Sequence, residues 1–277
     1  MMAATSPAPE ALATEAAVPP CIGVFDSGVG GLTVLRALRS TMPDAPLHYV
    51  ADSGHAPYGP KSTEAILARC LAIGEHLIAH GAALIVVACN TATAHAVAAL
   101  RARWPALPIV GIEPGIKPAV QATRNGRIAV MATQATVNSE RYRQLIATHG
   151  GDVHVHSQAC PGLVDRIETG DLNDERLQEL LKTYTDAVKA SGADTVLLGC
   201  THYPFIQDRI EALLGPDITV LNTEGAVARQ AHKRWAALEL PASAPSVRLE
   251  STGDPAPLSR LATLALQAPQ VARQIDI

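Results

Sequence analysis

The sequence predicts an α/β protein of two similar lobes, each a mostly parallel sheet flanked by helices, with the functional site between the lobes. Short apolar runs alternate with longer amphipathic segments along the 277 residues, which is the pattern of β-α units. Two stretches, 81–91 and 192–202, also align without gaps, and each carries a cysteine after an apolar run. A repeated half-molecule accounts for both observations.

The expected strands are short runs rich in β-branched and other apolar residues. They cover 22–25, 47–51, 83–88, 109–112, 127–131, 153–156, 195–199 and 218–221, with an edge strand at 247–251. Helices are expected at 31–41, 62–80, 92–103, 139–148, 173–190 and 205–213, with one more beginning near 160 and a last one after 255. Ser62 and Asn173 are the expected N-caps, because their side-chain oxygens accept hydrogen bonds from the free N–H groups of a first turn.

A second pair of matching segments supports the duplication, because 22–28 resembles 128–134 in pattern and position. The Pro-containing segment 113–118 is expected to cross between the lobes, since each proline disfavours helix in the residue before it. A second crossing is expected at 222–225. The domain prediction is therefore a disordered N-terminal tail at 1–20, a first lobe of 21–116 plus 225–277, and a second lobe of 117–224.

Composition argues against several classes of partner. The net charge is −4, no run of five like charges occurs, and only 3% of residues are aromatic, so neither nucleic acid nor an anionic membrane surface is expected. No apolar run approaches the roughly 20 residues that a membrane helix needs. The five cysteines form no Cys-x-x-Cys pair, which fits a reducing cytoplasm. A small-molecule ligand is the expected partner, and a homodimer is left open.

Two of the cysteines stand where open α/β sheets bind ligands. Cys89 and Cys200 each follow a strand-length apolar run and precede small polar residues, at the carboxyl end of the expected strand. A thiol just before a helix feels the helix N-terminus, so we expect its pKa to lie below the reference value of about 8.5. Cys21, Cys70 and Cys160 are interpreted as buried core residues.

Four uses of the paired thiols compete. A disulfide does not suit a cytoplasmic protein. A zinc site of Cys89, Cys200 and His202 leaves a ligand position vacant and lacks supporting motifs, so no metal is predicted. A Cys-His nucleophile for acyl transfer gives one of the cysteines no role. The fourth use is two-base proton transfer, in which one thiolate removes a proton from a stereogenic carbon and the opposing thiol protonates the other face.

The two-base interpretation is favoured because two facing half-molecules place one base on each side of a carbon. Such a site must also stabilise the developing carbanion with positioned donors and exclude water. The chain contains neither a pyridoxal phosphate signature nor a dinucleotide fingerprint, so we expect no cofactor.

Other polar residues follow the same strand ends. Asp26, after the first strand, is expected to accept hydrogen bonds from an ammonium group or to orient a thiol, and otherwise to cap the next helix. The segment 57–59 is interpreted as a loop that closes over a ligand, with an ordinary turn as the alternative. Thr133 and Thr136 offer hydroxyls to a carboxylate or cap a loop. His202, two residues beyond Cys200, is expected to tune that thiol or shuttle its proton.

Four ordered motifs resemble those of the glutamate racemase family. They are Phe25-Asp26-Ser27-Gly28-Val29-Gly30-Gly31-Leu32, Pro57-Tyr58-Gly59, Ala88-Cys89-Asn90-Thr91-Ala92 and Gly199-Cys200-Thr201-His202-Tyr203-Pro204, and the match spans residues 21 to about 270. The resemblance implies a cofactor-independent racemase of two α/β lobes that interconverts L- and D-glutamate for peptidoglycan synthesis. It makes Cys89 and Cys200 the acid/base pair.

The same resemblance implies further site residues. The residues expected to line the substrate are Asp26, Ser27, Tyr58, Gly59, Asn90, Thr91, Thr201 and His202. Glu168 falls in a segment like the family's and joins Asp26 and His202 as a helper of the thiols. An aspartate or hydantoin racemase, and a non-catalytic two-lobed amino-acid binding protein, remain as alternatives; binding alone does not require two matched thiols.

Overall fold

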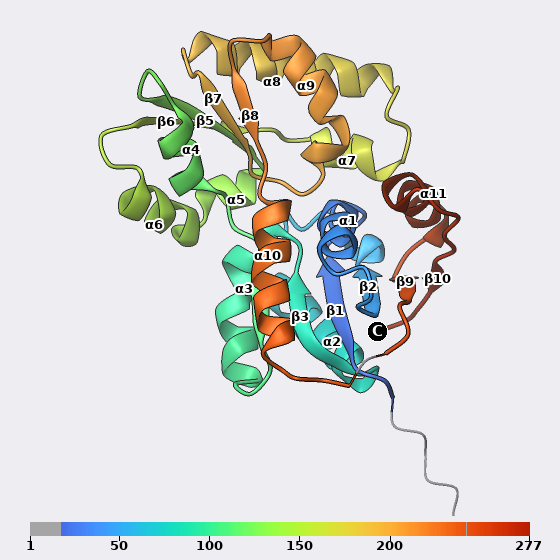
Figure 1. The fold of residues 1–277 in the computed structure, drawn as a ribbon. Coiled ribbons are helices and arrows are strands. Elements are labelled where there is room, and N and C mark those ends of the chain that lie inside the picture. Colours follow the sequence, from blue (N-terminus) through green and yellow to red (C-terminus); the bar gives the residue numbers. More distant parts are fainter. Residues whose placement is uncertain (1–17, 242) are drawn as a thin grey trace, which may run out of the picture.

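The computed structural model describes residues 18–241 and 243–277, which form two lobes, each around its own sheet (Figure 1). Every strand pairing in both sheets is parallel. Most of the expected N-terminal tail, 1–17, lies outside the described residues, and 18–20 lead into the first strand. In the described part of the chain, no helix has the length and apolar character required to cross a bilayer.

The first lobe holds a six-stranded sheet in the order β10-β9-β2-β1-β3-β4. Its strands are β1 (Cys21–Asp26), β2 (Leu47–Ala51), β3 (Ala82–Val87), β4 (Ile109–Gly111), β9 (Val247–Ser251) and β10 (Arg273–Gln274). The two strands from the C-terminal segment therefore extend the sheet beyond β2. β1 and β3, which precede candidate site residues, are neighbours in its interior.

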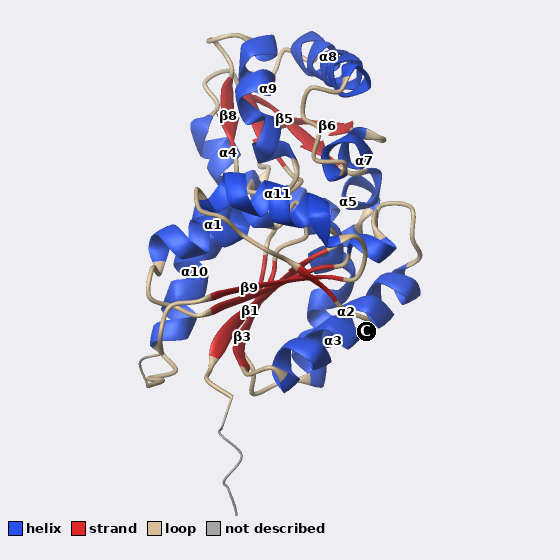
Figure 2. Ribbon diagram, turned by 90° about the vertical axis from the view of Figure 1, so that its right-hand side faces the viewer, coloured by secondary structure: helices blue, strands red, loops and turns tan. Residues whose placement is uncertain are grey.

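Two helical layers cover the first sheet (Figure 2). One face packs against α1 (Leu32–Thr41), α10 (Glu224–Ala236) and α11 (Pro255–Leu266), around buried residues such as Leu35 and Leu258. The other face packs against α2 (Thr63–Ala79) and α3 (Asn90–Arg103), around residues such as Ile73 and Leu100. Because both faces are covered, the interior strands β1 and β3 are almost wholly buried and largely apolar, as expected for a parallel sheet.

The second lobe holds a four-stranded sheet in the order β6-β5-β7-β8. Its strands are β5 (Arg127–Ala132), β6 (His154–Ala159), β7 (Thr195–Leu198) and β8 (Thr219–Leu221). The helices α7 (Leu163–Glu168), α8 (Glu175–Ala190) and α9 (Gln207–Leu214) pack against one face. The other face meets α4 (Ile116–Ala122) and α6 (Glu140–His149), and the short α5 (Gln134–Asn138) contacts both α6 and α3 of the first lobe.

The two sheets share one strand order. β2-β1-β3-β4 of the first lobe corresponds in chain order to β6-β5-β7-β8 of the second. The paired segments of the sequence thus become β1 with β5 and β3 with β7. α4 packs on β7, and α10 packs on α1 and β3, so the chain passes between the lobes just before each of these helices.

Some local expectations were wrong. The N-cap of α8 is Asp174, whose carboxylate accepts a hydrogen bond from Leu177 N at 2.8 Å, while the Asn173 side chain accepts one from Arg209. The crossing segment also becomes helical at Ile116, because Pro118 lies in the first turn of α4, where its missing N–H removes no helical hydrogen bond.

Candidate active site

A cleft of about 570 Å³ lies where the carboxyl ends of both sheets meet. Its walls come from the segments that follow β1, β3, β5, β6 and β7, with the loop 57–60 beside them. Ten of the sequence-predicted site residues line it: Ser27, Tyr58, Gly59, Cys89, Asn90, Thr91, Thr133, Cys200, Thr201 and His202. The two lobes therefore bring Cys89 and Cys200 to one shared cavity.

Cys89 is the N-cap of α3 and is 5% exposed. Its sulfur accepts a hydrogen bond from Ala92 N at 3.4 Å and donates one to Ser27 Oγ at 3.6 Å. Burial, reinforced by the negative charge of Asp26, raises the Cys89 pKa to about 12. The expectation of a lowered pKa was wrong for this thiol, because the N–H groups of the helix start only partly offset the cost of desolvating a thiolate.

Cys200 has a different neighbour. Its sulfur lies 3.6 Å from His202 Nδ1, and His202 Nε2 lies 2.5 Å from Glu168 Oε1. Burial by itself lowers the His202 pKa, but the hydrogen bonds to Cys200 and Glu168 more than offset it and hold the pKa well above 6.5. The His202 imidazole therefore places a positive charge beside the Cys200 sulfur.

Two glycines of the first lobe make room for this pair from the second lobe. A Cβ on Gly28 would lie 1.9 Å from Glu168 Oε1, and one on Gly30 would lie 2.3 Å from His202 Nδ1. Glu168 Oε1 also accepts a hydrogen bond from Val29 N at 2.8 Å. The loop after β1 thus packs directly against Glu168 and His202 of the second lobe.

Asp26 is fully buried and does not line the cleft. Its carboxylate accepts hydrogen bonds from Gly28 N at 2.8 Å, Thr201 Oγ1 at 2.9 Å and Ser27 Oγ at 3.3 Å. Burial raises the Asp26 pKa to about 6, against the opposing influence of His202 and the Gly28 N–H. Asp26 thus links the loop of the first lobe to the residue that follows Cys200.

The predicted threonines form a cluster between the lobes. Thr91 Oγ1 lies 3.1 Å from Thr133 Oγ1 and 3.4 Å from Thr136 Oγ1, and Thr133 donates to Thr136 at 3.0 Å. Thr133 also caps α5 by accepting from Thr136 N. Thr91 and Thr133 face the cleft, whereas Thr136 lies behind them and is 1% exposed.

Asn90 and Tyr58 differ in how their polar groups are engaged. Within the described residues, neither Asn90 Nδ2 nor Asn90 Oδ1 has a hydrogen-bond partner, although both are buried. The Tyr58 hydroxyl donates to Asp52 Oδ2 at 2.6 Å, so the residue presents its ring to the cleft. Asn90 is therefore a donor and acceptor available to a ligand.

Three of the predicted site residues lie behind the residues that line the cleft, and one segment that does line it was not predicted. Asp26, Glu168 and Thr136 contact lining residues without lining the cleft themselves. The segment after β6 supplies Cys160, Pro161, Gly162, Val164 and Asp165. The parallel β-α pattern was the available signal for this segment, since the carboxyl end of β6 must also reach this edge.

The sequence matches a family model. Residues 32–231 match the model described as Asp/Glu/Hydantoin racemase. The glutamate racemase of Ectopseudomonas mendocina is 50% identical over 235 residues, which is 84% of this chain and 89% of that protein. The glutamate racemase of Herpetosiphon aurantiacus is 48% identical over 243 residues, or 87% of this chain and 95% of that protein.

Solved structures give the same result. The crystal structure of Escherichia coli glutamate racemase with L-glutamate and the activator UDP-MurNAc-ala aligns with a TM-score of 0.83 at 29% identity, covering 93% of this chain and 98% of that one. The Francisella tularensis enzyme in complex with D-glutamate aligns at 0.80 with 27% identity, covering 93% and 97%. The chain therefore belongs to the glutamate racemase family, amino-acid racemases within the Asp/Glu/hydantoin racemases.

Proposed function

We propose that this protein interconverts L- and D-glutamate in the cytoplasm without a cofactor and supplies D-glutamate for peptidoglycan synthesis. The observation that carries the proposal is the placement of Cys89 and Cys200 on one cleft, after β3 and β7, which occupy corresponding positions in the two sheets. Inversion of a carbon without turning the substrate over requires one base on each face, and this arrangement supplies two.

The different surroundings of the thiols support different resting roles. With its pKa raised to about 12, Cys89 is a protonated thiol near neutral pH and is suited to deliver a proton. His202 Nδ1 lies 3.6 Å from the Cys200 sulfur and Glu168 holds the imidazole in place, so His202 can exchange a proton with this thiol, which suits Cys200 to remove the α-proton. After one turnover Cys200 carries the proton taken from the substrate, and Cys89 is a thiolate that has given its proton to the opposite face of the α-carbon. Exchange with solvent or the reverse reaction resets the pair.

Glutamate binding is proposed to use the unengaged polar groups of the wall. Asn90 Oδ1 is an acceptor for the α-ammonium group, and Asn90 Nδ2 is a donor for a carboxylate. The hydroxyl groups of Ser27, Thr91, Thr133 and Thr201 also line the wall. Those of Ser27 and Thr201 donate to Asp26, so their oxygens are further acceptors for the ammonium group. An ammonium ion bound near Cys89 also offsets the negative charge of Asp26, so substrate binding makes the Cys89 thiolate easier to form.

The test is incubation of the pure protein in deuterated water with each enantiomer of glutamate and of aspartate, without added cofactor. We expect inversion of glutamate with one deuterium at the α-carbon of the product. Remaining substrate should stay largely protiated early in the reaction, because each face has its own base. Proton NMR and circular dichroism follow the two quantities.

Negative results are informative in the same assay. Absence of exchange with all four amino acids would contradict the racemase proposal. Faster inversion of aspartate than of glutamate would identify aspartate as the preferred substrate. Early deuteration of the unreacted substrate at the rate of inversion would point to one base shared by both faces and remove the two-thiol mechanism.

A further inference from the structure

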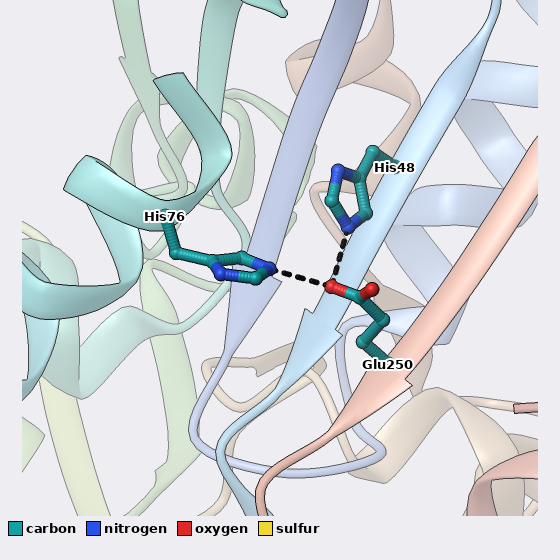
Figure 3. A group of neighbouring side chains, drawn as sticks. All are labelled: His48, His76 and Glu250. Atoms are coloured by element: carbon teal, nitrogen blue, oxygen red, sulfur yellow. Dashed lines mark hydrogen bonds and ion pairs between the residues drawn. The ribbon is translucent and has the colours of Figure 1, made fainter. Parts of the chain in front are cut away.

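A second group of chemically reactive side chains lies away from the cleft, between the first sheet and α2. His48 projects from β2, Glu250 from β9 and His76 from the last turn of α2 (Figure 3). His48 Nε2 and His76 Nε2 each lie 2.7 Å from the same oxygen, Glu250 Oε2. None of the three residues lines the catalytic cleft.

The three ligand atoms are held close together and two of the residues are deeply buried. All three atoms lie within 4.8 Å of one another, and they form the only such group of three found in residues 18–241 and 243–277. His48 is 2% exposed and Glu250 is 1% exposed. In a tetrahedral zinc site with bonds of about 2.0–2.2 Å, neighbouring ligand atoms are about 3.3 Å apart. Each of the two 2.7 Å contacts between a histidine Nε2 and Glu250 Oε2 must therefore lengthen by roughly half an ångström to admit an ion.

The hydrogen bonds of the group are those of a carboxylate held between two imidazoles. Glu250 Oε2 is shared by His48 Nε2 and His76 Nε2, each at 2.7 Å, while Glu250 Oε1 accepts from Arg248 Nε at 2.7 Å. Metal ligation requires each histidine to present an unprotonated Nε2. An entering ion takes the place of the two protons that now point at Oε2, and these return to Nδ1 through solvent.

Neighbouring side chains set the orientation and the access route. Arg248 donates to Glu250 Oε1 at 2.7 Å through Nε, which leaves Oε2 for the histidines. The His80 ring lies 4.2 Å from the His76 ring, centroid to centroid, and its Nδ1 bonds the His76 carbonyl oxygen. A pocket of about 340 Å³ is lined by His48, His80 and Arg248 among others, so it adjoins the group on the His48 side.

We propose that His48 Nε2, His76 Nε2 and Glu250 Oε2 form a binding site for a divalent transition metal such as Zn²⁺, with the fourth position open to water on the pocket side. Two imidazoles and one carboxylate are the ligand set of several zinc sites. Arg248 offsets the charge of the carboxylate, so nitrogen donors dominate and Mg²⁺ and Ca²⁺, which prefer oxygen ligands, are not expected to bind.

Such an ion would act on stability rather than on the proton-transfer chemistry. It would join β2 and α2 to β9, and thereby tie the C-terminal segment to the first lobe. An ion that binds only the folded state raises the free energy of unfolding. We therefore expect Zn²⁺ to raise the melting temperature, and EDTA to reverse the rise while the racemase reaction continues.

The test uses full-length, tag-free protein carrying Cys89→Ser and Cys200→Ser, because thiols in the cleft are competing zinc ligands. Isothermal titration should show one Zn²⁺ per chain and no binding of Mg²⁺. X-ray absorption at the zinc edge should show nitrogen and oxygen neighbours at about 2.0–2.1 Å and no sulfur at about 2.3 Å. His76→Gln and Glu250→Gln should each abolish this binding, while His154→Gln, at an exposed histidine on β6, should retain it.

Four outcomes would overturn the proposal: no binding, a sulfur-containing zinc shell, unchanged affinity in His76→Gln, or loss of binding in His154→Gln. His76 is at the end of α2 and 12% exposed in its side chain, so the glutamine variant is expected to fold. Circular dichroism melts of each variant without metal check this. If Glu250→Gln is unfolded, the comparison of the two histidine variants still decides the question.

Discussion

The two thiols of the cleft differ in the charges next to them. Cys89 has the Asp26 carboxylate nearby, and Cys200 has the His202 imidazole that Glu168 holds. We expect Cys89→Ser and Cys200→Ser each to lower kcat for inversion by at least about 100-fold, because a serine hydroxyl is a far weaker acid and base at neutral pH. Polarimetry in both directions measures this, with Cys70→Ser, at a buried thiol outside the cleft, as the matched control.

Retention of full turnover by either cleft variant would remove that cysteine from the mechanism. A comparable loss in Cys70→Ser, with an unchanged melting temperature, would mean that the assay responds to thiol loss in general rather than to the cleft.

The raised pKa of Asp26 predicts a pH dependence of stability. Its pKa is 3.8 ordinarily and about 6 in the folded protein, because burial disfavours the carboxylate. Between these values the folded state holds a proton that the unfolded state has lost, so the contribution of Asp26 to the free energy of unfolding falls as pH rises through this window. Asp26→Asn should flatten this part of the curve, as measured by urea denaturation from pH 4 to pH 7.

A difference between wild type and Asp26→Asn that stays constant across the window would show that Asp26 does not titrate there. Asp44→Asn, at an exposed carboxyl group, serves as the reference variant for the change of charge alone.

At the scale of elements, the loop between β1 and α1 packs against His202 and fixes its position. A methyl group on Gly30 would lie 2.3 Å from His202 Nδ1, so Gly30→Ala must displace the imidazole or the loop. We expect a cost of about 1–3 kcal/mol in the free energy of unfolding and a fall in kcat larger than any change in KM. Gly59→Ala is the control for stability, since a Cβ at Gly59 meets no atom within 4 Å.

Wild-type kcat and stability in Gly30→Ala would show that the loop adjusts to the added methyl group and that the position of His202 does not depend on close packing at Gly30.

Helix α8 offers a test of the corrected N-cap. Asp174→Ala should lower the free energy of unfolding by about 0.5–2 kcal/mol, because the Leu177 N–H loses its acceptor. Asn173→Ala, one residue earlier, should cost less. Thermal denaturation of the pair decides between the two capping residues, and a larger loss at Asn173 would contradict the structure.

At the scale of the whole molecule, a ligand held by both lobes should stabilise both. D- or L-glutamate at saturating concentration is expected to raise the melting temperature of Cys89→Ser as well as of the wild type, because the proposed binding groups Asn90 and Thr201 remain. Differential scanning calorimetry measures the shift, with D-alanine, which lacks the second carboxylate, as the comparison ligand. An equal shift with D-alanine would contradict recognition of the side-chain carboxylate.

The strands and the thiol pair were predictable because both depend on local pattern. β2 and β9 begin and end at the predicted residues, and the segments carrying Cys89 and Cys200 follow strand ends. The prediction that β9 is an edge strand was wrong, because β10 pairs on its outer side. The N-cap at Ser62 is confirmed by its hydrogen bond from Ala65 N. The helix beginning at Ile116 and the N-cap at Asp174 were missed. In both cases neighbouring residues could equally begin the helix, and the apolar periodicity does not distinguish between them.

The sequence by itself determined the α/β class, the duplicated plan and the two cysteines, since periodicity and motif order are properties of the chain alone. The tertiary structure decided what surrounds those cysteines: the burial that raises the Cys89 pKa, the His202–Glu168 pair beside Cys200, and the place of Asp26 behind the wall. It also brought His48, His76 and Glu250 together across more than two thirds of the chain. Distances between segments remote in sequence, and the desolvation that follows from them, exist only once the lobes have packed.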